Sequence, residues 1–131
     1  MIAIDTSVLI AILNDEEEAH KFQDILDMSP RNVLGAPTKF ELQMVAIGRK
    51  GELGRSMVSD MLAEFRIEIL PWTGEMAEIA TTAFLCFGRG SRHPAKLNFG
   101  DCMAYALAKA LEAPLLFKGD DFSKTDIWSA L

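Results

Sequence analysis

The sequence predicts an α/β fold in which helices cover both faces of a parallel sheet. Short apolar segments at 2–4, 66–70 and 115–117 are typical of buried strands, and longer segments between them repeat apolar residues at helical spacing. Strands that alternate with helices usually form a parallel sheet. A chain of 131 residues, half of them hydrophobic, can bury a core of its own. Residues 1–131 are therefore expected to form a single domain.

The first half of the chain begins with the strand at 2–4. Asp5, Thr6 and Ser7 follow it and supply oxygen atoms that cap the start of a helix. An acidic tract at 15–18 is expected to open the next helix, because negative charge stabilises the positive end of the helix dipole. The other elements expected before residue 66 are a helix at 8–13, a weak strand at 32–35, and helices at 37–50 and 55–65 on either side of Gly51 and Gly54.

The second half of the chain has clear end signals for its elements. Pro71 ends a strand, Gly88 ends a helix, and Asn98 caps a long alanine-rich helix. The elements expected here are a strand at 66–70, helices at 73–87 and 99–112, a strand at 115–117 and a last short strand at 127–128.

The net charge of −6 argues at first against a nucleic-acid partner. The excess lies in residues 1–28, however, which hold seven acids and one base, whereas the remaining residues hold twelve of each. Between 79 and 100 there is no acid, and four basic residues lie near the end of that stretch: Arg89, Arg92, His93 and Lys96. A substrate that carries phosphate groups is therefore not excluded.

The cysteines and the apolar runs indicate the cellular setting. Cys86 and Cys102 lie in apolar helical stretches, which is typical of a reduced protein in the cytoplasm. No apolar run approaches the ~20 residues of a membrane span, so no membrane association is expected. The opening residues lack the basic flank of a signal peptide.

Acids follow two of the predicted strands. Asp5 comes directly after the strand at 2–4, and Asp120 and Asp121 come shortly after the strand at 115–117. In open α/β sheets, ligands bind beyond the carboxyl ends of the strands. A helix cap for Asp5 and a simple turn for the aspartate pair remain alternatives.

Two further acids have unusual surroundings. Asp101 is the only charged residue between 99 and 108, in a predicted helix with almost entirely apolar faces, where an unpaired carboxylate is costly. Glu41 lies beside Met44 and Val45 on its helix, where a solvent-facing glutamate usually has polar neighbours. The alternatives are that Asp101 stabilises the helix dipole and that Glu41 lies at the edge of an amphipathic helix.

Four separate acids at one edge of a sheet would repel one another unless a cation lay among them. Carboxylate oxygens suit Mg²⁺ or Mn²⁺ better than zinc, and the sequence has no Cys/His spacing for zinc. It also has no glycine-rich phosphate loop, no Gly-x-Ser-x-Gly turn and only two histidines. Metal-assisted hydrolysis is the chemistry that remains.

These segments also resemble a known family. Residues 2–9, Ile-Ala-Ile-Asp-Thr-Ser-Val-Leu, resemble the opening of PIN-domain ribonucleases. Residues 92–108, which contain Leu-Asn-Phe-Gly-Asp, and 115–122, which contain Phe-Lys-Gly-Asp-Asp-Phe, are similar to VapC toxins, the nucleases of type II toxin–antitoxin pairs. The resemblance covers essentially the whole chain. It implies a PIN-like three-layer sandwich, with acids gathered at one edge of the parallel sheet.

The resemblance implies an activity and the residues that carry it. Asp5 and Asp101 match the principal metal-binding acids, and Glu41 matches the acid on the helix after the second strand. The fourth acid is Asp120 or Asp121. The implied activity is that of an endoribonuclease toxin, which hydrolyses RNA with a water activated by Mg²⁺ or Mn²⁺. The residues implied to bind near the metal or the RNA are Thr6 and Ser7, through a hydroxyl, and Arg89, Arg92, His93 and Lys96, for which a solvated loop is the alternative.

The resemblance also implies partners. A VapB-type antitoxin would lay its C-terminal segment across the toxin groove, often with a basic side chain near the acids. The apolar helices at 40–47 and 57–65 are expected mainly to pack in the core, and otherwise to contact that antitoxin or a second copy in a homodimer.

Two other interpretations remain open, and a third fails. A catalytically silent PIN-like binding module ranks below the nuclease, because all four acidic positions are filled. A receiver-type phosphoacceptor domain would need an acidic pair after the first strand, where Asp5 stands alone, and an acceptor aspartate after a middle strand. A haloacid-dehalogenase-type phosphatase needs Asp-x-Asp after its first strand, and residues 5–7 do not match that pattern.

Overall fold

A four-stranded parallel sheet forms the middle layer of the computed structural model, which describes residues 1–131. Its strands lie in the order β3-β2-β1-β4, and every neighbouring pair is parallel. Their bounds are Ile2–Ile4 for β1, Asn32–Gly35 for β2, Ile67–Leu70 for β3 and Leu115–Leu116 for β4. The strand predicted as weak, β2, is fully buried at the centre of the sheet.

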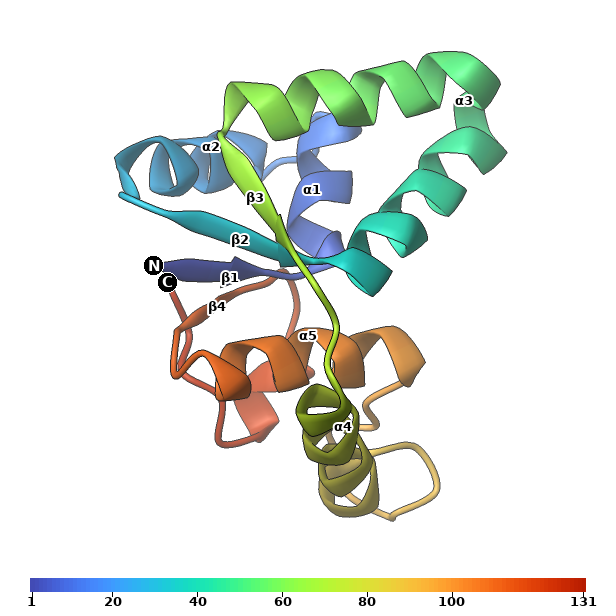
Figure 1. Cartoon of the computed structure of the whole chain (residues 1–131), viewed down its shortest axis with the longest axis vertical. Helices are drawn as coiled ribbons and strands as arrows, with labels where there is room; N and C mark the ends of the chain where they lie inside the picture. The colour runs from blue at the N-terminus through green and yellow to red at the C-terminus, as the bar shows by residue number, and fades with distance from the viewer.

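Helices cover both faces of this sheet (Figure 1). One face carries α1 (Thr6–Leu13), α2 (Ala19–Met28) and α3 (Ala36–Glu64), and the other carries α4 (Gly74–Phe87) and α5 (Phe99–Ala110). A short 3-10 helix, η1 (Phe122–Lys124), follows the last strand. The predicted α/β architecture with three layers is confirmed. No helix is both long and apolar enough to cross a bilayer.

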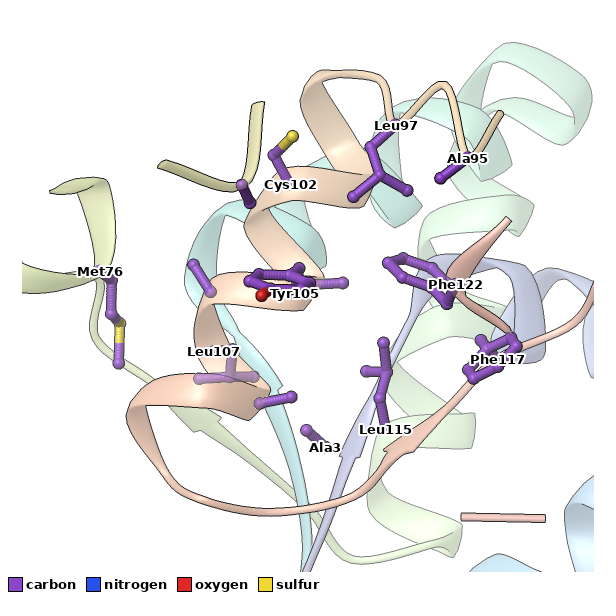
Figure 2. Packing of buried hydrophobic residues seen from close by; sticks show 14 of the residues in the cluster. Ala3, Met76, Ala95, Leu97, Cys102, Tyr105, Leu107, Leu115, Phe117 and Phe122 are labelled. Atoms are coloured by element: carbon purple, nitrogen blue, oxygen red, sulfur yellow. The ribbon is translucent and has the colours of Figure 1, made fainter. Parts of the chain in front are cut away.

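The alternation of side chains along the strands divides the core into two clusters. The cluster on the side of α4 and α5, drawn in Figure 2, takes one residue from each of three strands, and the cluster on the other side takes the next residue of each. These residues are Ala3, Val33 and Leu115 on the first side, and Ile4, Leu34 and Leu116 on the second. Both clusters are buried, so the sheet is fixed between its two helical layers.

Helix α3 is bent at Gly51, whose φ of 57° and ψ of −139° interrupt the helix. Its two legs form the V-shaped hairpin in Figure 1. The predicted break at Gly51 is therefore confirmed, but Gly54 is glycine for a different, steric reason. Gly54 is buried against the first leg, where a Cβ atom would overlap the carbonyl group of Ala46. Glycine is needed at that position because the two legs approach each other closely.

Two predicted elements differ in the structure. The acidic tract precedes α2 instead of opening it, because Glu16 and Glu18 pair with Lys118, on the segment after β4. The strand predicted at 127–128 does not form. The chain makes only one isolated bridge there, between Leu115 and Ser129, because β4 is just two residues long and offers little edge to extend.

Candidate active site

Asp5 lies where the central strand β1 passes into α1. Its carboxylate Oδ2 accepts a hydrogen bond of 3.0 Å from the backbone N–H of Ser7, so it caps the helix as the sequence predicts. Its backbone N–H donates to the carbonyl of Leu116, which ties it to the end of β4. The residue is only 6% exposed, so its charge has almost no contact with water.

Asp101 and Glu41 reach the same edge from α5 and α3. Asp101 Oδ2 accepts from the backbone N–H of Asn98 at 3.0 Å, and Asn98 Oδ1 accepts from the backbone N–H of Asp101 at 2.8 Å. This capping box fixes Asp101 in the first turn of the most deeply buried helix. Glu41 Oε1 accepts a hydrogen bond of 2.5 Å from the hydroxyl of Thr6 on α1.

The pKa values show that these carboxylates act on one another. Burial, with smaller contributions from the charges of Asp101 and Glu41, raises the pKa of Asp5 to about 6, and hydrogen bonds from Ser7 oppose that rise. Burial also raises the pKa of Asp101, and the charges of Asp121 and Glu41 add to that effect. Four acids from separate parts of the chain therefore share one region, where their like charges oppose ionisation.

The structure distinguishes between the two adjacent aspartates. Asp121 acts electrostatically on Asp101, whereas Asp120 faces a turn in which its backbone carbonyl accepts from the hydroxyl of Ser123 at 2.6 Å. Both side chains are exposed, and Asp120 is not among the main charges that raise the pKa of Asp5 or Asp101. Asp121 is therefore the candidate for the fourth acid of the site, and its place there stays a prediction.

Both hydroxyls expected near a metal or a phosphate already have protein partners. The Thr6 hydroxyl donates to Glu41, and the Ser7 hydroxyl accepts from the backbone N–H of Lys118 at 3.0 Å. Ser7 thereby joins the start of α1 to the segment that carries Asp121. In this structure, both residues hold other parts of the candidate site in place.

The predicted basic residues lie beside the acids. A hollow of about 590 Å³ is lined without any hydrophobic side chain, by Arg89, Gly90, Arg92, His93, Pro94, Lys96 and Asp121. Arg89 also lowers the pKa of Asp101, which brings the hollow and the acids into one continuous region. His93 has a structural part here, because its Nδ1 accepts from the N–H of Ala95 at 3.1 Å and its ring packs edge-on against Phe87.

Two residues of this region were missed by the sequence analysis. Lys118 pairs with Glu16 and with Glu18, and so ties the loop before α2 to the segment after β4. Gly100 lies directly beneath the carboxylate of Glu41. A signal for Gly100 was available, since a glycine inside a helical pattern often marks a close approach of another group.

The donor set fits a hard divalent cation in type and in charge. No three Asp, Glu, His or Cys side chains surround a common point closely enough to coordinate a metal ion together. Mg²⁺, however, is usually held by one or two carboxylates and completes its shell with water. Asp5 and Asp101 meet that requirement, because both are carboxylates whose burial and like-charged neighbours raise the pKa.

Comparison with known proteins places the fold in a class. A family model described as the PIN domain matches residues 2–127, which is nearly the whole chain. Two solved structures share the fold over 96% of their own length: VapC20 from Mycobacterium tuberculosis, with a TM-score of 0.77 at 15% identity, and VapBC2 from Rickettsia felis bound to a promoter DNA fragment, with a TM-score of 0.76 at 17% identity. They cover 97% and 98% of this chain.

Curated relatives are more similar in sequence. Ribonuclease VapC28 from Mycobacterium tuberculosis is 39% identical over 128 residues, which cover 98% of this chain and 96% of the relative. Ribonuclease VapC42 from the same species is 39% identical over 125 residues, 95% of each chain. The chain therefore belongs to the VapC ribonucleases of the PIN-domain family, which are generally dependent on a divalent metal ion. This membership sets aside the receiver-type interpretation.

Proposed function

We propose that this protein is the toxin of a type II toxin–antitoxin pair and hydrolyses RNA phosphodiester bonds with Mg²⁺ or Mn²⁺. The observation that carries the proposal is the convergence of Asp5, Glu41, Asp101 and Asp121 at the carboxyl edge of the sheet, with raised pKa values at Asp5 and Asp101. Acids that raise one another's pKa cost stability, the more so because Asp5 is buried, and their presence together favours a site for a cation. The names of the curated relatives support the same activity.

Within this proposal the acids have distinct tasks. Asp5 and Asp101 would hold the metal ion, which would supply a water of lowered pKa and offset charge on the phosphoryl oxygens. Glu41 has one oxygen occupied by Thr6, while its Oε2 accepts no hydrogen bond from the protein and is available to take up a proton. Asp121 adds charge beside Asp101 and lies on the border with the basic hollow.

The direct test is cleavage of an internally labelled RNA by the purified protein. Cleavage is expected with Mg²⁺ or Mn²⁺ and is expected to stop in excess EDTA, because the acids alone cannot activate a water near neutral pH. Fragments with internal ends would identify an endonuclease. Undiminished cleavage in EDTA would refute the metal mechanism. Metal-dependent RNA binding without cleavage would favour the silent binding module instead.

We propose that the basic hollow binds the RNA backbone beside the acids. Arg92→Gln with Lys96→Gln is expected to raise the KM for RNA and to lower the slope of log affinity against log salt by about 1.5–2, because each of the two lost phosphate contacts would release counterions. Arg89 is left intact because it acts on Asp101. Binding is measured by fluorescence anisotropy between low and moderate salt. The control is Lys21→Gln on the exposed side of α2, and an equal effect of that change would refute the assignment.

A second surface fits the proposed antitoxin. A groove of about 510 Å³ between α4 and α5 is lined mostly by apolar side chains, and its rim includes Phe84 and Phe99, which are 47% and 81% exposed. Phe99 is two residues from Asp101, so a segment with both apolar and basic side chains would match the groove and the acids together. Expression of this protein is expected to arrest growth, and co-expression of the product of a neighbouring small gene is expected to relieve the arrest. Absence of a complex between the two proteins on gel filtration would refute the proposed antitoxin partner.

A homodimer is proposed through the first leg of α3. The helical segments 40–47 and 57–65 are predicted to pack mainly in the core, and Val58, Met61 and Phe65 do so. Phe40, Met44 and Ile47, in contrast, are exposed on one stripe of the helix. A second copy would cover this stripe. Analytical ultracentrifugation of the wild type and of Met44→Lys would compare their oligomeric states and so test this interface.

A location in the cytoplasm stays a prediction.

A further inference from the structure

Gly100 is buried at the start of α5, directly before Asp101. A methyl group added to its Cα would overlap Oε2 of Glu41 and would lie 3.0 Å from both Cδ and Oε1 of the same side chain. These are the three nearest atoms that such a methyl group would meet. The carboxylate of Glu41 therefore occupies the space that any side chain at position 100 would fill.

The opposite side of the same carboxylate is also held. Oε1 of Glu41 accepts the hydrogen bond from the hydroxyl of Thr6, which directly follows Asp5. The carboxylate thus lies between the start of α1 and the start of α5, and its charge acts on both Asp5 and Asp101. The hydroxyl of Thr6 binds one oxygen of this carboxylate, and the bare Cα of Gly100 leaves the space that the carboxylate fills.

We infer that Gly100 is a positioning residue, whose missing side chain allows the carboxylate of Glu41 to lie within reach of Asp5 and Asp101. The inference rests on the proposed nuclease function. Glycine is less favourable than alanine in a helix, and φ at position 100 is not in the left-handed region, so backbone conformation does not require glycine there. The position of Glu41 supplies the reason for a residue that otherwise weakens the helix.

The test is Gly100→Ala, measured first by Mn²⁺ binding with electron paramagnetic resonance. The methyl group is expected to push the Glu41 carboxylate aside, and Mn²⁺ affinity is expected to fall about tenfold, the usual effect of disturbing groups around a metal site. The loss in RNA cleavage is expected in kcat and not in KM, since the RNA-binding hollow is untouched. The melting temperature of the metal-free protein is expected to stay the same or to rise by up to about 4 °C, because alanine favours the helix.

The matched control is Gly48→Ala, in the helical part of α3, where an added methyl group would meet no atom within 4 Å. It is expected to leave Mn²⁺ affinity unchanged. The decisive comparison is Gly100→Ala in a Glu41→Ala background, where it is expected to weaken Mn²⁺ binding by less than twofold, because the group it displaces is gone.

The outcomes separate this inference from the proposed function. A tenfold loss that persists in the Glu41→Ala background, or no loss in either background, would overturn the role of Gly100. A wild-type protein that neither binds Mn²⁺ nor cleaves RNA would instead overturn the proposed function. A marked fall in melting temperature for Gly100→Ala alone would show that α5, and not Glu41, requires the glycine.

Discussion

Asp5→Asn and Asp101→Asn are each expected to lower RNA cleavage by at least about a hundredfold while the fold stays intact. Loss of a group around a metal ligand commonly costs 10–100-fold in affinity or activity, and loss of a proposed ligand should cost at least as much. Asparagine removes the charge but keeps the shape and the oxygen atom that accepts from a backbone N–H. The cap on Ser7 and the capping box with Asn98 can therefore persist.

The matched control is Asp120→Asn, one residue away from the fourth acid of the cluster. Asp120 is not among the main charges that raise the pKa of Asp5 or Asp101, so its variant is expected to cleave RNA within about twofold of the wild type. Asp121→Asn is expected to lose activity. Circular dichroism and melting curves would verify that each variant folds. Undiminished cleavage by both Asp5→Asn and Asp101→Asn would refute the assignment of the acids. A larger loss of cleavage for Asp120→Asn than for Asp121→Asn would show that Asp120, and not Asp121, is the fourth acid.

The metal-free protein is expected to lose stability as the pH rises, because of Asp5. Folding raises the pKa of this carboxyl from 3.8 to about 6, so the native state binds a proton more tightly than the unfolded chain does. The resulting stabilisation is fully present below about pH 4 and is lost as the pH rises through 6. The full amplitude is about 3 kcal/mol, and roughly half of it falls between pH 5 and pH 8.

This prediction is measured by urea unfolding in EDTA at pH 5 and pH 8. Asp5→Asn cannot ionise and is expected to lack this pH dependence, so at pH 8 it is expected to be more stable than the wild type by about 1–3 kcal/mol. Adding Mg²⁺ is expected to stabilise the wild type more than this variant, because binding to the native state adds to its stability. Asp24→Asn, on the exposed side of α2, is the control. A wild type as stable as Asp5→Asn at pH 8 in EDTA would show that burial of the charge carries no cost.

At Asp5, stability and activity are expected to change in opposite directions. The same desolvation that raises the pKa of Asp5 leaves its charge free to attract a cation instead of water. A variant that folds better and cleaves worse is the expected result at such a position. Improvement or loss of both properties together would point to a purely structural role for Asp5.

Local signals in the sequence are sufficient for most of the architecture. Apolar runs bounded by Pro71 and Gly88 define strand and helix ends, and the cap at Asn98 gives the start of α5 correctly. Asp5 and Asp101 are also recognisable in advance, because an acid after a buried strand and a lone acid in an apolar helix both stand out from their neighbours. Such signals depend only on residues a few positions apart, so they can be recognised without knowledge of the fold.

Two of the differences arise where residues that are not neighbours along the chain come into contact. The acidic tract at 15–18 has the composition of a helix start, but Glu16 and Glu18 form ion pairs with Lys118, far away in the sequence. Gly54 has the appearance of a chain break, yet it is needed because the two legs of α3 come into contact there. The composition of a short segment does not identify the partner that it will meet.

The acidity of the chain illustrates both cases. The number of acids, their residue types and the strands and helices that carry them follow from the amino-acid order alone, because each depends on neighbours along the chain. Which of Asp120 and Asp121 joins the cluster, and which glycine leaves room for Glu41, depends on how α1, α3, α5 and the segment after β4 meet at the edge of the sheet. Charge interaction and steric exclusion act through space over a few ångströms, and only the packed fold sets those distances.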